Sequence, residues 1–218
     1  MNLISYGGKT MSNIIRATVT IRGTRPMLIH HFGPDAIPLE RRERTGVAGH
    51  DPEEWKRTVL MTADRQVYVP SEYILANFRG GAKIAFGSRG GHATRLAACL
   101  LVYDEHILFN RFVPENINEL INRIDDDVYL DVRGVKQPIT KARNIRYRVA
   151  LSAGWQSTFT IIWDKTLISR DEMHSIVIHS GQFVGLGDGR NIGFGRYSVE
   201  VFDFLGKEEV SDATSSTM

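Results

Sequence analysis

Cysteine is almost absent from the sequence. The single one, Cys99, lies in the apolar run Leu96–Val102, so we expect it to be a buried core thiol. One thiol cannot form an intrachain disulfide or supply a cysteine-rich zinc site, and the histidines show no paired spacing of the zinc type. We therefore expect a core built by hydrophobic burial alone, with no metal and no cofactor.

Long hydrophobic runs and a strong net charge are also missing. No segment approaches the ~20 apolar residues of a membrane span, and the first residues lack the charged-then-apolar layout of a signal peptide, so we expect a cytoplasmic protein without membrane contact. Lys and Arg number 27 against 25 Asp and Glu, a formal net charge of +2. A polyanion-binding surface therefore has to be argued from the distribution of charge, not from its total.

The spacing of apolar residues predicts an α+β fold. Ile15, Ala17, Val19 and Ile21 alternate with polar residues, which is typical of a half-buried strand. The expected core elements are a strand at 14–22, a helix at 71–86, strands at 143–150 and 156–164, a helix at 169–180 and a strand at 196–204. The order βαββαβ is that of a ferredoxin-like (RRM-like) domain.

We expect one domain over residues 13–205, interrupted by long insertions at 23–70 and 87–140. The N-terminal residues 1–12 and the tail 206–218 are polar and should be disordered. No internal repeat is visible in the sequence.

A glycine-rich segment at 185–195 lies between an expected helix and the last strand. Its glycines permit positive φ and allow close approach to a phosphate or to another stretch of backbone. The segment leads from a helix into a strand, the reverse of a dinucleotide fingerprint, and lacks the Gly-Lys-Ser/Thr ending of a phosphate-binding loop.

Residues 185–196, Gly-Leu-Gly-Asp-Gly-Arg-Asn-Ile-Gly-Phe-Gly-Arg, resemble the C-terminal glycine-rich loop of the RAMP superfamily of CRISPR-associated proteins. The pair Asp51-Pro52, followed by Val67-Tyr-Val-Pro-Ser71 and a helix with Arg79, resembles the layout of Cas7-like backbone subunits. Arg25-Pro-Met-Leu-Ile-His30 resembles their opening turn. This Cas7/RAMP-like resemblance spans residues 14–202 and implies ferredoxin-like domains that assemble into machinery binding CRISPR RNA.

The sequence departs from the Cas7-like pattern in two places. Glu72 and Tyr73 replace the expected Gly-Ser pair. In Cas7-like subunits that cut target RNA, an Asp stands shortly before the Asp-Pro pair, and the run Arg44–His50 contains none. The resemblance therefore implies binding rather than cleavage of RNA.

Basic residues in two clusters, together with the glycine-rich segment, are the predicted contacts to nucleic acid. Cations on a helix, on loops or on one strand face suit a grip on phosphates without reading of bases. Ordinary solvated charge is the alternative, and Asp125–Asp127 and Asp131 could neutralise the second cluster. The predicted contacts are Arg79, Lys83, Arg89 and Arg95; Lys136, Lys141, Arg143, Arg146 and Arg148; Gly185, Gly187, Gly189, Arg190 and Arg196; and Phe32, which would stack on a base.

Two adjacent histidines, His30 and His31, are weak candidates for catalysis. A pair of imidazoles could act as general base and acid in metal-independent RNA cleavage. Neighbouring residues on an extended chain point opposite ways, so at most one would face a given site.

These observations predict a non-catalytic subunit that binds single-stranded nucleic acid, with RNA favoured over DNA. It would line up with copies of itself and with other subunits along a guide RNA in a CRISPR-type ribonucleoprotein. Two alternatives stay open: a metal-independent endoribonuclease of the kind that processes CRISPR RNA, and a structural or assembly protein without nucleic acid.

Overall fold

The computed structural model describes residues 13–33, 51–136 and 143–205. Its centre is a four-stranded antiparallel sheet of β1 (Ile14–Gly23), β4 (Leu101–Val102), β8 (Gln156–Asp164) and β9 (Tyr197–Phe204). The strands lie in the order β4-β8-β1-β9. Along β1 the predicted alternation is present, because Ile15, Ala17, Val19 and Ile21 are buried while the residues between them are not.

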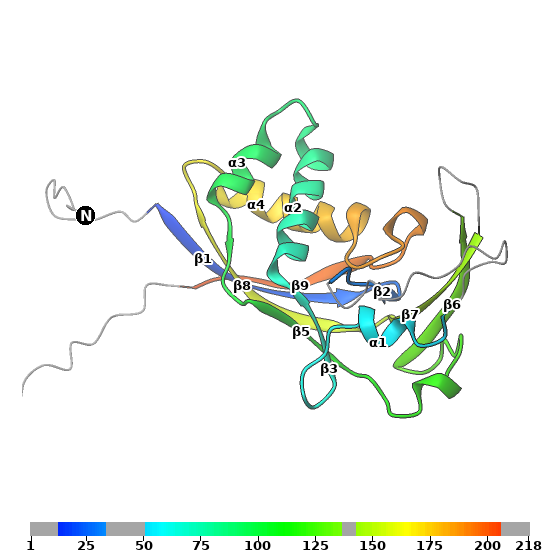
Figure 1. Cartoon of the computed structure of the whole chain (residues 1–218). Helices are drawn as coiled ribbons and strands as arrows, with labels where there is room; N and C mark the ends of the chain where they lie inside the picture. The colour runs from blue at the N-terminus through cyan, green and yellow to red at the C-terminus, as the bar shows by residue number, and fades with distance from the viewer. Residues whose placement is uncertain (1–12, 34–50, 137–142, 206–218) are drawn as a thin grey trace, which may run out of the picture.

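Helices α2 (Ser71–Phe86), α3 (His92–Cys99) and α4 (Arg170–His179) lie on one face of this sheet (Figure 1). The sequence Ser169-Arg-Asp-Glu172 predicts a capping box, and α4 begins with one: Ser169 accepts from the amide of Glu172, and the Glu172 carboxylate accepts from the amide of Ser169. Along the chain, this unit runs β1, α2, α3, β4, β8, α4 and β9. If α2 and α3 are counted as one helical segment, this is the order βαββαβ. The predicted α+β, ferredoxin-like class is confirmed.

The second core strand was predicted wrongly. It is the short β4, which pairs with β8, whereas the predicted strand at 143–150 is β7 (Arg143–Leu151) of another sheet. The stretch 87–140, expected to be an insertion, thus contains a core strand. The alternating pattern of β7 is long and obvious, while β4 has two residues, so sequence periodicity favours the wrong segment.

β7 is the middle strand of a three-stranded sheet with β2 (Met27–Ile29) and β6 (Val128–Lys136). A two-stranded sheet of β3 (Gln66–Pro70) and β5 (His106–Phe112) lies beside the core, where Ser157 of β8 donates to the carbonyl of Leu108 in β5. The shorter helices are α1 (Glu54–Thr58), the 3₁₀ turns η2 (Ile117–Glu119) and η4 (Arg190–Ile192), and the π-helical turn η3 (Ser180–Val184) that continues α4.

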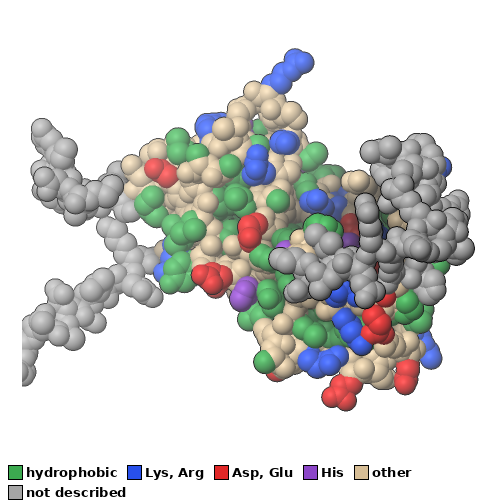
Figure 2. Space-filling model, in the orientation of Figure 1, with side chains coloured by type: hydrophobic (Ala, Val, Ile, Leu, Met, Phe, Trp, Pro, Cys, Tyr) green, Lys and Arg blue, Asp and Glu red, His purple; other side chains and the backbone are tan. Residues whose placement is uncertain are grey.

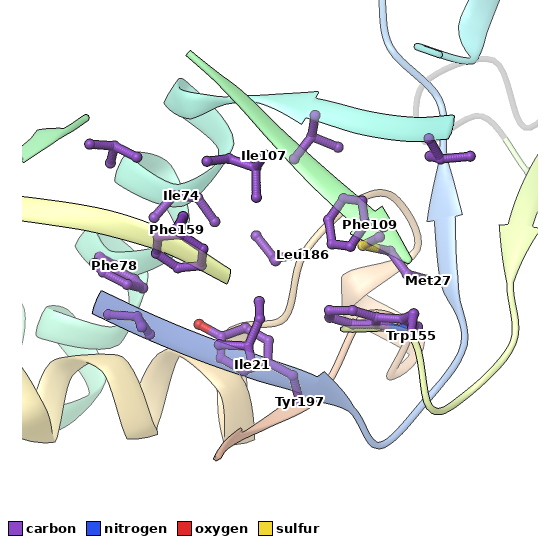
Figure 3. Packing of buried hydrophobic residues seen from close by; sticks show 14 of the residues in the cluster. Ile21, Met27, Ile74, Phe78, Ile107, Phe109, Trp155, Phe159, Leu186 and Tyr197 are labelled. Carbon is purple, nitrogen blue, oxygen red and sulfur yellow. The ribbon is translucent and has the colours of Figure 1, made fainter. Parts of the chain in front are cut away.

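One hydrophobic core joins these elements (Figure 3). Trp155 and Phe159 are buried, and the centroids of the Trp155 and Phe109 rings, which meet edge to face, are 5.4 Å apart. Leu186, from the glycine-rich segment, points into the same cluster and is 1% exposed. This side chain anchors the segment to the core.

Within the ranges that the structure describes, no helix is long and apolar enough to cross a membrane.

Candidate nucleic-acid interface

The glycine-rich segment packs against the backbone around β2. The amide of Asp188 donates to the carbonyl of Leu28 at 2.8 Å, and the amide of Gly195 donates to the carbonyl of Pro26 at 2.7 Å. Gly187 has a φ of 74°, and a Cβ there would stand 2.4 Å from the Leu28 oxygen. Of the two uses expected for these glycines, close approach to another stretch of backbone is the one present here.

The predicted contacts of Gly185, Gly187 and Gly189 with nucleic acid stay predictions. The amide of Gly185 already donates to the Ser180 carbonyl, and the amide of Gly189 donates to the Asp188 carboxylate at 2.7 Å. The path of this segment is therefore explained by contacts within the protein.

A pocket of about 370 Å³ opens between the glycine-rich segment and the N-terminal half of α2. It is lined by His30, Glu72, Tyr73, Ala76, Gly185, Leu186, Gly187, Asp188 and Arg190. The structure thus brings together four of the predicted site residues, His30, Gly185, Gly187 and Arg190. Sequence reasoning missed the α2 side of the pocket, because nothing local to Pro70-Ser71 indicates what the first turns of that helix face.

Asp188 belongs to a chain of ion pairs beneath the segment. Arg148 donates to Asp188 at 2.8 Å and to Asp131 at 3.0 Å, and Arg133 donates from Nε to both Asp131 oxygens at 2.8 Å. Burial raises the pKa of Asp188, but hydrogen bonds from Arg148 and the Gly189 amide outweigh it and lower the pKa below its usual value. Asp188 is therefore ionised at neutral pH.

Arg148 is 4% exposed between these two carboxylates. This position does not fit the predicted phosphate contact, because the guanidinium already has anionic partners and almost no free surface. Residues two apart on a strand share a face, so the sequence predicts that Arg148 and Arg146 point the same way. It does not show that carboxylates from β6 and the glycine-rich segment cover Arg148.

Arg146 takes part in a second cluster, around Glu54 of α1. The Glu54 carboxylate accepts from Arg146, from the amide of Tyr147 at 2.9 Å and from His30 Nε2 at 3.3 Å. Burial raises the pKa of Glu54, but these hydrogen bonds outweigh it and lower the pKa to about 2. The cluster ties α1 to β7 and fixes His30 at the pocket.

The two histidines point in different directions, as expected for adjacent residues. His30 contacts Glu54, while His31 Nδ1 lies 3.3 Å from the hydroxyl of Tyr73 in the first turns of α2. Phe32, the next residue, is 72% exposed. An exposed aromatic ring therefore follows a residue that touches the start of α2.

The cations on α2, on the turn after it and on α3 differ from those on β7. Arg79, Lys83, Arg89 and Arg95 are all exposed, and none forms an ion pair within the part of the chain that the structure describes. Figure 2 shows Lys and Arg side chains over this part of the surface, with few acidic groups between them. Arg79 and Lys83 lie one and two turns beyond Ala76, so their stripe on α2 leads away from the pocket.

The other predicted contacts are scattered. Lys136 is exposed at the end of β6, and Arg196 is partly exposed and donates to the Arg190 carbonyl at 3.4 Å. Lys141 and the side chain of Arg143 lie outside the described residues, as do the terminal segments 1–12 and 206–218. Among the described side chains, no group of three His, Cys, Asp or Glu could hold a metal ion.

No protein-family model matches the chain, and no curated protein matches its sequence. A similar backbone occurs in the cryo-EM structure of the type III-B Cmr-beta bound to cognate target RNA, at 12% sequence identity and a TM-score of 0.49. The match covers 88% of this chain and 61% of that one, so this chain spans about three fifths of its neighbour's length.

Proposed function

We propose that this chain binds single-stranded RNA as a Cas7-like subunit of a CRISPR-type ribonucleoprotein, alongside copies of itself and other subunits. The observation that carries the proposal is the set of four exposed cations on α2, α3 and the turn between them, Arg79, Lys83, Arg89 and Arg95, none of which has a carboxylate partner among the described residues. Arg133 and Arg148 are neutralised by Asp131 and Asp188, whereas these four cations keep their charge free on two adjoining helices and the turn between them.

Unpartnered cations on one helical hairpin favour a polyanion because each phosphate contact releases condensed counterions. Such contacts hold the backbone and read no sequence, which suits a subunit that would repeat along a guide. The exposed ring of Phe32 supports a single strand over a duplex, since bases of single strands are free to stack on aromatic side chains. The resemblance of residues 185–196 to the RAMP glycine-rich loop supports the family assignment.

The direct test is reversal of charge on α2. In Arg79→Glu/Lys83→Glu we expect the affinity for a labelled single-stranded RNA to fall by about tenfold or more, because two phosphate contacts become repulsive. Fluorescence anisotropy of the purified protein measures the affinity, and circular dichroism verifies the fold of each variant.

The matched control is Arg22→Glu/Arg123→Glu. These two exposed cations also lack a carboxylate partner among the described residues, but they lie away from the helices: Arg22 is on the face of β1 opposite buried Ile21, and Arg123 is in the turn before β6. The control should bind like the unaltered protein. Equal affinity of the two double variants would reject the proposed surface, and absence of binding by the unaltered protein would favour a purely structural role.

A second candidate function is metal-independent RNA cleavage. It is favoured by one observation: His30 lines the pocket and His31 touches Tyr73, so an imidazole and a phenol stand near a cavity. Cleavage of labelled RNA in EDTA that is lost in His31→Ala would support it. RNA that stays intact after prolonged incubation would reject cleavage and favour binding alone.

A further inference from the structure

The pocket beside α2 has the size of a small-molecule site. Its volume of about 370 Å³ lies near the lower end of small-molecule pockets, roughly 300–1,000 Å³. Leu186 is an apolar lining residue, and Tyr73 and Ala76 contribute the α2 wall. The glycine-rich segment forms the opposite wall, with Gly185, Gly187 and Asp188 among its lining residues.

The charges of the pocket argue against a phosphate. Asp188 is ionised at neutral pH, and Glu72 adds a second carboxylate on an exposed position of α2. Arg190 is the one guanidinium among the lining residues. An anionic group would meet two like charges here, whereas a neutral ring with both donors and acceptors would not.

Asp188 retains hydrogen-bonding capacity toward the pocket. A carboxylate can accept about four hydrogen bonds. Asp188 accepts one from Arg148 and one from the Gly189 amide. Its side chain is 46% exposed, so the remaining positions are reachable from solvent. Arg148 and the Gly189 amide also fix the direction of the carboxylate.

A carboxylate and a guanidinium together match one nucleobase. Guanine presents two adjacent donors, N1–H and N2–H, which pair with a carboxylate, and two acceptors, O6 and N7, which pair with an arginine. Adenine and cytosine offer one amino group each, and uracil offers one N–H between two acceptors. Only guanine pairs fully with Asp188 and with Arg190 at the same time.

We propose that this pocket binds a guanine of the RNA strand, with Asp188 accepting from its N1–H and N2–H and Arg190 donating to its O6 or N7. The inference rests on the proposed function, because the cations of α2 bring the strand to the mouth of the pocket. Contacts between the α2 cations and phosphates are independent of base sequence, and the pocket adds selectivity for one base.

The test compares oligouridine with the same oligomer carrying one central guanine, adenine or cytosine. The guanine oligomer should bind the unaltered protein about tenfold more tightly than the others, the lower part of the range for one good bidentate base contact. GMP should compete with it better than AMP, CMP or UMP. Fluorescence anisotropy measures both series.

Ala76→Leu blocks the pocket without touching the Asp188–Arg148 pair, because Ala76 is an exposed helical residue. It should remove the preference for guanine. Ala97→Leu, at an exposed position of α3, is the matched control and should keep the preference.

Three results overturn the inference. Equal binding of all four oligomers by a protein that still loses affinity in Arg79→Glu/Lys83→Glu refutes the pocket and leaves the proposed function standing. A guanine preference that survives in Ala76→Leu places the selectivity elsewhere. Binding of GMP without binding of any oligomer refutes the strand as the source of guanine, together with the proposed function.

Discussion

Replacing Glu54 by Gln tests the cluster that joins α1 to β7. In the folded protein the carboxylate accepts from Arg146, His30 and the amide of Tyr147, and its side chain is 11% exposed. An amide of the same shape keeps the volume but loses the charge and one of the acceptor oxygens. The helix α1 should therefore lose its attachment to β7.

The expected magnitude follows from the pKa of Glu54. This pKa falls from its ordinary value of 4.5 to about 2 in the folded protein. At about 1.4 kcal/mol per pKa unit, the ionised form contributes up to about 3 kcal/mol to the free energy of unfolding at neutral pH. Arg146 is 37% exposed, so solvent screening brings the expected loss in Glu54→Gln to about 2 kcal/mol.

The sign of the pH dependence is fixed by the direction of the pKa shift. A carboxyl group with a lowered folded pKa stabilises the protein above its unfolded pKa, and this contribution is lost as the pH falls from about 5 toward 2. The difference between the unaltered protein and Glu54→Gln should thus be largest at pH 7 and shrink markedly by pH 3.

Urea unfolding followed by tryptophan fluorescence at several pH values measures this difference. The control is Glu53→Gln, since the neighbouring Glu53 pairs with Lys56 on the surface at 47% exposure and should contribute little. The reasoning is refuted if Glu53→Gln costs as much as Glu54→Gln, or if the cost of Glu54→Gln does not change between pH 7 and pH 3.

Further predictions concern the glycine-rich segment, helix α4 and the bound strand. Arg148→Met should lower the free energy of unfolding by about 3–5 kcal/mol in chemical denaturation, because two carboxylates lose a shared buried cation. Gly195→Ala should prevent stable folding or lower the melting temperature strongly, since the new Cβ would stand 1.8 Å from a backbone oxygen, whereas Gly134→Ala meets no atom within 4 Å and should melt like the unaltered protein. Ser169→Ala should cost about 1 kcal/mol through loss of the cap of α4, with a smaller effect contradicting the capping box. RNA affinity should decline linearly with the logarithm of salt concentration, with a shallower slope in Arg79→Glu/Lys83→Glu, and a slope unchanged in that variant would exclude phosphate contacts on α2.

Features that depend on near neighbours in the chain could be predicted from the sequence. The alternation of β1, the bounds of α2 and the capping box of α4 were all predicted correctly. Each rests on side chains a few residues apart, whose spacing determines the buried face or satisfies the first amides of a helix.

The tertiary structure alone decided which segment became the second core strand and which cations stayed free. β4 has two residues, too few for a periodic signal, and gains its place by pairing with β8. Arg148 meets partners 17 and 40 positions away, and Arg146 meets Glu54 at a separation of 92. Ion pairs over such separations exist only after the chain has folded, so charge along the sequence cannot distinguish a buried ion pair from a cation available to a phosphate.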